Sequence, residues 1–247
     1  MTSPVISDAA LRAKRGEPLT FLGSAPYFAG LLIVAIVAFW PTYLSRVARA
    51  SGYTHLHAVT ASSWMLLLVA QPLAIRTRRI ALHRTLGRAS YVIAPLVVIS
   101  MVLLAHSKTH GAAREDLVGA YVPLSLAALF ALSYTLGIAT RRTMSLHARF
   151  MVCTAMTLID PVFVRLLNWI YATPPFLYQW ITFSLTDAVF AVLIWRERHS
   201  RAGRGVFPVL LALFVLSQFI ALSGLYQARS WEAFMRWFAA LPLTSPH

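Results

Sequence analysis

The sequence predicts an all-α fold, a polytopic membrane helix bundle with about seven transmembrane helices. Three observations lead to this prediction. Hydrophobic residues make up 58% of the 247 residues and charged residues only 12%, whereas soluble domains carry about 25% charged residues. Apolar stretches recur along the whole chain, each near the roughly 20 residues that a spanning helix needs. Arginines gather in alternate connections between those stretches. The lipid bilayer is therefore the expected surrounding of this chain.

Seven apolar stretches are long enough to be expected as spans. Tyrosine and tryptophan stand near many of their ends, as is typical of rings that anchor a helix at headgroup level. The predicted spans are 25–46, 56–75, 89–106, 117–139, 148–170, 177–195 and 206–227.

The distribution of basic residues predicts the orientation. Of the 22 lysines and arginines, fifteen fall in the N-terminal tail and in the second, fourth and sixth connections, and six fall in the other connections and the C-terminal tail. Because cytoplasmic loops carry the excess of Lys and Arg, the N-terminus is expected in the cytoplasm and the C-terminus outside a cell inner membrane. The same distribution explains the net charge of +14 without a nucleic-acid partner, since no basic face with interleaved aromatics stands clear of the spans.

Three parts follow from this topology: a cytoplasmic tail (1–24), a seven-span domain (25–228) and an outer tail (229–247). Apolar residues of the outer tail recur at i, i+3, i+4 and i+7, which predicts a short amphipathic helix on the outer membrane surface. They are Trp231, Phe234, Met235 and Phe238.

The second and fourth connections resemble each other, as "TRRIALHR" and "TRRTMSLHAR". Each places a Leu-His pair just before a span, so His83 and His147 are expected at a similar depth on the inner side. The stretches "HAVTASSWMLLLVAQP", "LHRTLGR" and "LHARFM" also resemble a bacterial family of multi-pass membrane proteins with no assigned function. The motifs cover about half of the chain. The resemblance implies a multi-pass fold and carries no catalytic residue across.

Histidines form a candidate metal site on the outer side. His55 and His57 open the second span, while His106 and His110 close the third. Antiparallel spans joined by a short connection are expected to be neighbours, so the four imidazoles could meet and bind zinc, copper or iron. The alternative is that these histidines are interfacial or hydrated.

A b-type haem is the sharper form of the same hypothesis, because bis-histidine ligation needs one histidine from each of two helices. His57 with His106 would serve outside, and His83 with His147 inside. The 23 residues between His83 and His106 span about 34 Å of helix, more than the roughly 30 Å hydrocarbon core. Both sites would therefore lie at the membrane edges.

Neighbouring side chains extend the haem hypothesis. Arg84 and Arg149 would meet the propionates. Trp64 and Gln71 share a face of the second span with His57 and would line a cofactor or substrate cleft. The alternative for Trp64 and Gln71 is packing and hydrogen bonding between helices.

Two acids are expected near the bilayer centre. Asp160 lies about 20 Å into the fifth span, and Asp187 and Gln218 fall at a similar depth in the next two spans. Arg165 lies about 7 Å further out than Asp160. A charge at midplane costs about 2.5–3.5 kcal/mol, so these groups need partners or a function.

Three interpretations of the acids stay open. In the first, Arg165 pairs with an acid of another helix, preferably Asp187, because Asp160 and Arg165 point in different directions on one helix. In the second, Asp160 carries protons or couples transport. In the third, which lacks histidines at that depth, the acids bind a metal.

Three functions follow: a redox protein holding haem or another metal, a proton-coupled carrier of a small molecule, and a non-catalytic assembly or sensor subunit acting through a partner membrane protein. Whether the chain is an enzyme stays open, since it carries no Walker, G-x-S-x-G or H-E-x-x-H motif. Retinal is not expected, because Lys14 and Lys108 are the only lysines and both lie outside the spans.

Overall fold

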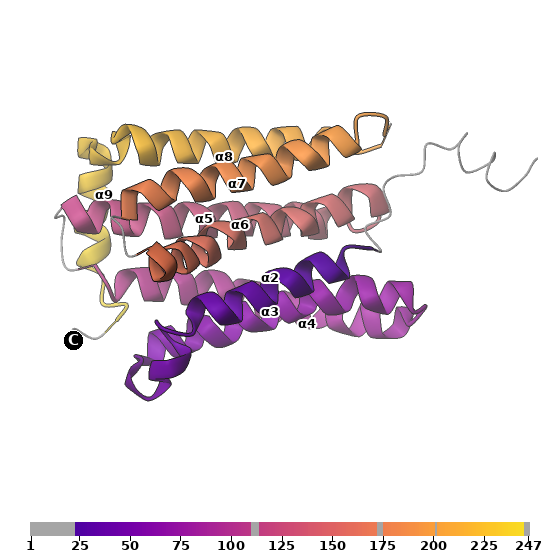
Figure 1. Ribbon diagram of the computed structural model, residues 1–247, viewed down its shortest axis with the longest axis horizontal. Helices are drawn as coiled ribbons and strands as arrows, with labels where there is room; N and C mark the ends of the chain where they lie inside the picture. Colours follow the sequence, from indigo (N-terminus) through magenta and orange to yellow (C-terminus); the bar gives the residue numbers. More distant parts are fainter. Residues whose placement is uncertain (1–22, 110–113, 172–174, 201, 245–247) are drawn as a thin grey trace, which may run out of the picture.

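The structure, a computed structural model, describes residues 23–109, 114–171, 175–200 and 202–244 (Figure 1). Over these residues the chain is helical and contains no strand, which confirms the all-α prediction. The α-helices are α2 (Ala25–Phe39), α3 (Gly52–Arg76), α4 (Ile80–His106), α5 (Arg114–Ala139), α6 (Met144–Tyr171), α7 (Pro175–Arg196), α8 (Val206–Ser223) and α9 (Arg229–Ala239), with short 3-10 segments η2 (Leu44–Arg49) and η3 (Leu225–Gln227).

Six helices, α3 to α8, contain a stretch long and apolar enough to cross a membrane. The protein is therefore a multi-pass membrane protein. The first predicted span, 25–46, is shorter than expected, because α2 ends at Phe39 after 15 residues, about 22 Å of helix. Pro41 follows closely, and a proline both lacks the backbone N–H and disfavours helix at the residue before it.

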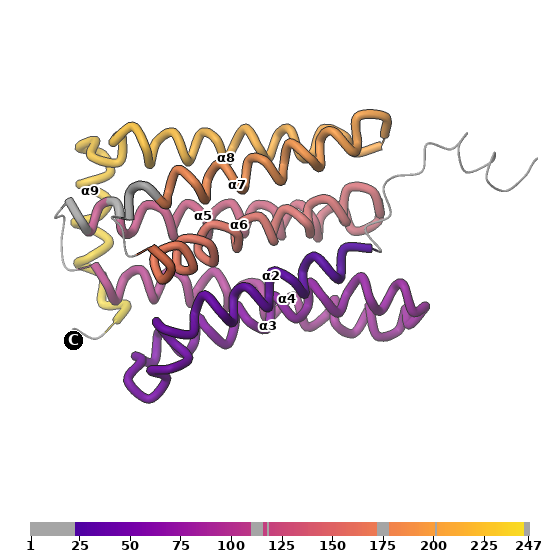
Figure 2. The backbone as a smooth tube through the Cα atoms, viewed as in Figure 1, coloured from indigo at the N-terminus to yellow at the C-terminus, as the bar shows by residue number. Residues whose placement is uncertain are grey.

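The long helices form two groups of four that share α5 and α6. In the first group, α3 packs on α4, α4 on α5 and α5 on α6, and α3 also touches α6. In the second, α6 packs on α7, α7 on α8 and α8 on α5. Figures 1 and 2 show α7 and α8 in one layer, α5 and α6 in the middle and α2 to α4 on the other side. Beside the first group, α2 packs on both α3 and α6.

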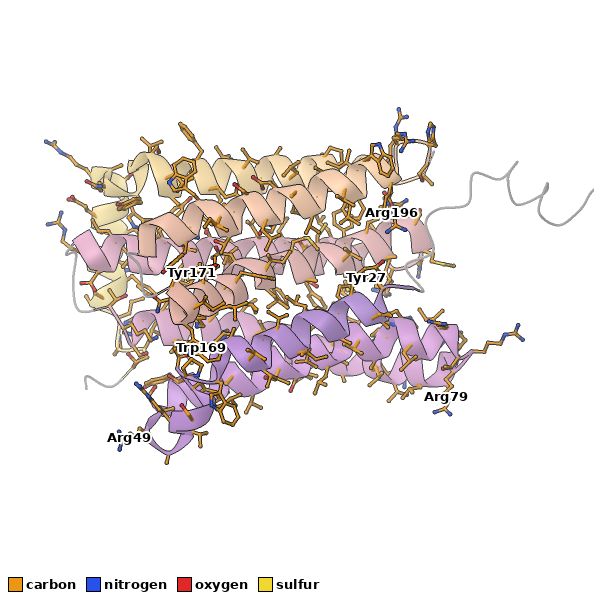
Figure 3. All side chains as sticks on the ribbon, viewed as in Figure 1. Tyr27, Arg49, Arg79, Trp169, Tyr171 and Arg196 are labelled. Atoms are coloured by element: carbon orange, nitrogen blue, oxygen red, sulfur yellow. The ribbon has the colours of Figure 1, made fainter. Side chains whose placement is uncertain are left out.

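The two ends of the bundle differ in their side chains. At the arginine-rich end, α3, α5 and α7 finish and α4, α6 and α8 begin; Figure 3 places Arg79 and Arg196 there. Arg49, Trp169 and Tyr171 lie at the opposite end. The alternation of arginines between connections therefore corresponds to two ends of one bundle.

The predicted helix of the C-terminal tail is confirmed as α9, which lies at the opposite end of the bundle (Figure 1). Met235 and Phe238 on its apolar face are buried against Leu117 and Ala120 of α5. Trp231 adds a hydrogen bond from its indole nitrogen to the Leu117 carbonyl at 3.0 Å. Much of the apolar stripe is therefore buried in protein, where the sequence pattern alone suggested lipid.

Trp64 of α3 fills the centre of the first group. Its side chain is 2% exposed and packs edge-to-face on Phe130 and Tyr134 of α5, with ring centroids 5.0 and 5.5 Å away. Its Nε1 donates a hydrogen bond to Thr154 Oγ1 of α6 at 3.2 Å. Buried indole N–H groups need such an acceptor, so Trp64 joins three helices and orients the inward face of α3.

Candidate functional site

His83 and His147 lie in the first turns of α4 and α6, at the arginine-rich end. Both are half-buried, and they are close enough for a charge on one ring to act on the other. Both helices begin at this end of the bundle, so the two histidines lie at a similar depth, as the sequence predicted. That they hold one cofactor between them stays a prediction.

The tautomer of His147 follows from its hydrogen bond. Nδ1 lies 2.8 Å from the Gly137 carbonyl oxygen, which can only accept, so Nδ1 carries the proton and Nε2 keeps its lone pair. Gly137 lies in the last turn of α5, where helix carbonyls lack partners within the helix. A histidine held through one nitrogen by a carbonyl is the usual arrangement for binding iron or zinc through the other.

His83 and Gln71 leave buried polar atoms unpaired. His83 Nδ1 and Gln71 Oε1 are buried and have no hydrogen-bond partner among the residues described. The Gln71 backbone lies close to the His83 ring, and a Cβ placed on Gly87, one turn after His83, would lie 3.8 Å from Gln71 Nε2. Buried polar atoms are nearly always satisfied, so this corner of the bundle has unused binding capacity.

The outer histidines behave differently, and the contacts of the three that are described do not support the predicted metal site, which stays a prediction. His55 Nδ1 hydrogen-bonds the Tyr43 hydroxyl at 3.0 Å, and His57 Nδ1 the Ser100 hydroxyl at 3.1 Å. His106 Nδ1 hydrogen-bonds the Thr244 hydroxyl at 2.6 Å. A separate hydroxyl bonds one nitrogen of each ring, and His106 Nε2 stays buried without a partner among the described residues. No three His, Cys, Asp or Glu side chains converge in the described part of the chain. His110 lies outside the described residues.

The outer haem pair is not supported by these contacts either. His57 faces α4 through Ser100, whereas His106 packs edge-to-face on Phe238 of α9 with ring centroids 5.0 Å apart. The tail helix, whose docking the sequence did not predict, therefore occupies the surroundings of His106.

Asp160 lies in the second group, 5% exposed. Its Oδ1 accepts hydrogen bonds from Gln179 Nε2 at 2.7 Å and from the Thr182 hydroxyl, both on α7. Asp187, also on α7, accepts a hydrogen bond from Gln218 Nε2 of α8 at 3.0 Å. Amide and hydroxyl groups thus serve as the partners of both acids.

The preferred pair of Arg165 with Asp187 is wrong. Arg165 Nη1 donates to the Pro161 carbonyl at 2.8 Å, and its guanidinium lies 4.6 Å from the ring centre of Phe39 on α2. Asp187 instead faces α8 through Gln218. The two charges therefore lie on different sides of α6.

A small cavity opens between the four helices of the second group. It has a volume of about 10 Å³, and its polar lining consists of Ser125, Asp160, Thr186, Ser217 and Gln218. This volume is about that of one water molecule. Asp160 and Gln218, predicted at one depth, line this cavity together, and Gln218 connects it to Asp187.

A buried ion pair between Arg149 and Glu197 was missed by the sequence analysis. Arg149 Nε donates to Glu197 Oε2 at 2.7 Å, with side-chain exposures of 0% and 1%. Arg149 also donates to the Ser145 carbonyl and to the Ser200 hydroxyl. Arg149 is thus committed to Glu197 and unavailable to a haem propionate. The available signal was an acid directly after an apolar span in the otherwise basic stretch "WRERHSR".

Comparisons of the chain with protein-family models, with curated proteins and with solved structures found no match in any of the three. The resemblance of its short motifs to a bacterial membrane-protein family therefore stays a prediction.

Proposed function

We propose that the chain is an inner-membrane protein that holds a b-type haem between His83 and His147 and takes part in one-electron transfer. What supports this proposal is that the two histidines lie in the first turns of α4 and α6 at one end of the bundle, where a charge on one acts on the other, with the proton of His147 held on Nδ1 by the Gly137 carbonyl. Nε2 of His147 is then free for iron. By the distribution of arginines, this end of the bundle faces the cytoplasm.

Haem fits this pair better than a bare transition metal. Structural and catalytic zinc sites use three or four protein ligands, and no group of three potential ligands exists among the described residues. A porphyrin provides four ligands to the haem iron, so the protein needs to provide only two axial ligands. Arg84, exposed and next to His83 in sequence, is the natural propionate partner, since Arg149 is bound to Glu197. The bound haem would supply one-electron redox chemistry between a small reductant and an oxidant.

The test is a reduced-minus-oxidised spectrum of the detergent-purified protein, extracted from cells supplied with haem precursor. We expect one haem per chain with the sharp α-band of six-coordinate, low-spin iron. His83→Leu and His147→Leu should each lose that band. His199→Leu removes an exposed histidine after α7 at the same end and should keep it. An unchanged band in both ligand variants, or the absence of haem from wild type, would refute the proposal.

A second candidate is a proton- or ion-coupled carrier, favoured by Asp160. This buried carboxylate lines a cavity, and the ion pairs among the described residues, Arg149–Glu197 and Arg236–Glu232, do not include it. Intramembrane acids without a paired cation are typical of coupling sites. The test is ion flux into proteoliposomes containing wild type or Asp160→Asn. Equal flux in the two would exclude Asp160 from transport.

A further inference from the structure

Two of the hydroxyl groups that line the cavity in the second group have their hydrogens used elsewhere. The Ser125 hydroxyl donates to the Val122 carbonyl at 2.9 Å, and the Thr186 hydroxyl donates to the Thr182 carbonyl at 3.0 Å. The Gln218 amide nitrogen donates to Asp187. Toward the cavity the two hydroxyl groups can therefore offer only lone pairs, while the Gln218 amide can offer its oxygen as well as its second N–H.

Asp160 adds a negative charge to this oxygen-rich lining. Both of its hydrogen bonds to described residues end on Oδ1, which leaves Oδ2 as a further acceptor. The charge of Arg165 acts on Asp160, but the Arg165 guanidinium donates its hydrogen bond to the Pro161 carbonyl. Acceptors that face one another repel in a low-dielectric interior, and a buried carboxylate without an ion-pair partner is costly. A positive occupant would satisfy the hydroxyl and amide oxygens and the carboxylate together.

The size and charge of the cavity narrow the choice of cation. Hard cations prefer carboxylate, carbonyl and hydroxyl oxygens. A space of about 10 Å³ admits one ion or one water and excludes an organic cation. One carboxylate balances one positive charge. We propose that this cavity binds a single sodium-sized monovalent cation through Asp160, Ser125, Thr186 and Gln218.

The location of the site connects it to the second candidate function. The ion would lie in the interior of the second group, with Asp160 directly before Pro161, whose missing N–H frees a carbonyl one turn earlier. The identity of the coupling ion rests on that carrier function, whereas ion binding itself depends neither on transport nor on haem.

Thermal unfolding of the detergent-purified protein tests the site. We expect the midpoint temperature to rise saturably with sodium chloride when choline chloride keeps the ionic strength constant, because a ligand that binds only the folded state stabilises it by mass action. Potassium should act more weakly because it is larger. The half-saturating sodium concentration should rise as the pH falls, since a proton competes for the same carboxylate.

Three variants identify the ligands. Asp160→Asn keeps an acceptor for Gln179 and Thr182, so it should fold, yet its sodium response should be lost. Ser125→Ala and Thr186→Val should raise the half-saturating concentration about tenfold or more, which is the lower range for disturbing a metal site. The control is Glu232→Gln, which removes a charge on α9 whose ion pair among the described residues is with Arg236, and it should respond as wild type does.

Two results would overturn the inference: an equal response of wild type to sodium and choline at every pH, or an unchanged sodium response in Asp160→Asn. Protonation of Asp160 without ion binding would give the first result. A sodium response without flux in proteoliposomes would refute the carrier function and leave the ion site standing. Flux without a sodium response would refute the ion site.

Discussion

Removing Arg149 should be among the most destabilising single changes in this protein. The guanidinium is 0% exposed. Its Nε donates a hydrogen bond to Glu197, and further hydrogen bonds go to Ser145 and Ser200. Glu197 Oε1 is already buried without a partner among the described residues, so Arg149→Met would leave the whole carboxylate unpaired. Breaking a buried pair in this way costs about 3–5 kcal/mol, and we expect a loss of that size.

A double-mutant cycle separates the ion pair from the packing. Arg149→Met and Glu197→Leu should each be strongly destabilising. Their combination should be far milder than the sum, because an apolar pair of similar volume often replaces a buried salt bridge at little cost. The measurement is the free energy of unfolding in mixed detergent micelles. A loss below about 1 kcal/mol for Arg149→Met, or simple additivity in the double variant, would show that the pair is not buried as described.

Three further predictions test other parts of the structure. Gly203 has φ of +77°, and a Cβ there would lie 2.9 Å from the Arg149 guanidinium. Gly203→Ala should therefore lower the unfolding free energy by about 1–2 kcal/mol. The control is Gly205→Ala, which has open space around it and should change the unfolding free energy little; equal effects of the two variants would contradict the geometry. Met235→Ala should lower the unfolding free energy by about 2–5 kcal/mol, because Met235 is fully buried against α5. Trp237→Ala changes a side chain that is 57% exposed, so it should lower the unfolding free energy by less than about 0.5 kcal/mol in detergent. The reverse order would mean that α9 is not docked on α5. Lys108 lies just after α4, and its pKa is lowered from 10.5, first by partial desolvation and then by the charge of a neighbouring arginine. The charged form is therefore disfavoured in the folded state, so Lys108→Met should be more stable than wild type at neutral pH. This gain in stability should shrink as the pH approaches 10.5, and a gain independent of pH would refute the prediction.

The sequence predicted the long helices and the depths of buried residues well, because both depend on local properties. A run of about 20 apolar residues must form a helix in lipid, and this accounts for α3 to α8. Helical rise per residue is constant, so counting along the spans was enough to place Asp160 and Gln218 at a similar depth, and both line one cavity. The error in the first span came from Pro41, whose effect on helix length the composition of the segment does not show.

The rotation of each helix about its own axis could not be predicted from the sequence in the same way. A span that is apolar all round has no marked inward face. The spacing of Asp160 and Arg165 along one helix was therefore the only guide to the partner of Arg165, and the pair with Asp187 that it favoured was wrong. The docking of α9 beside His106 and the pairing of Arg149 with Glu197 depend on contacts between distant segments. Such contacts leave no periodic pattern in one sequence.

The order of the helices has a consequence for biosynthesis. Helices enter the membrane from the N-terminus onward as the chain is made, so the proposed pair of His83 and His147 would be complete once α6 is inserted. Asp160 then still lacks Gln179 and Thr182, because α7 carries both. A lone midplane acid costs about 2.5–3.5 kcal/mol, so α6 is a costly helix to release into lipid until α7 arrives. A nascent chain stalled between these two helices should be held at the insertion machinery, and the histidine pair would assemble there before the acid site exists.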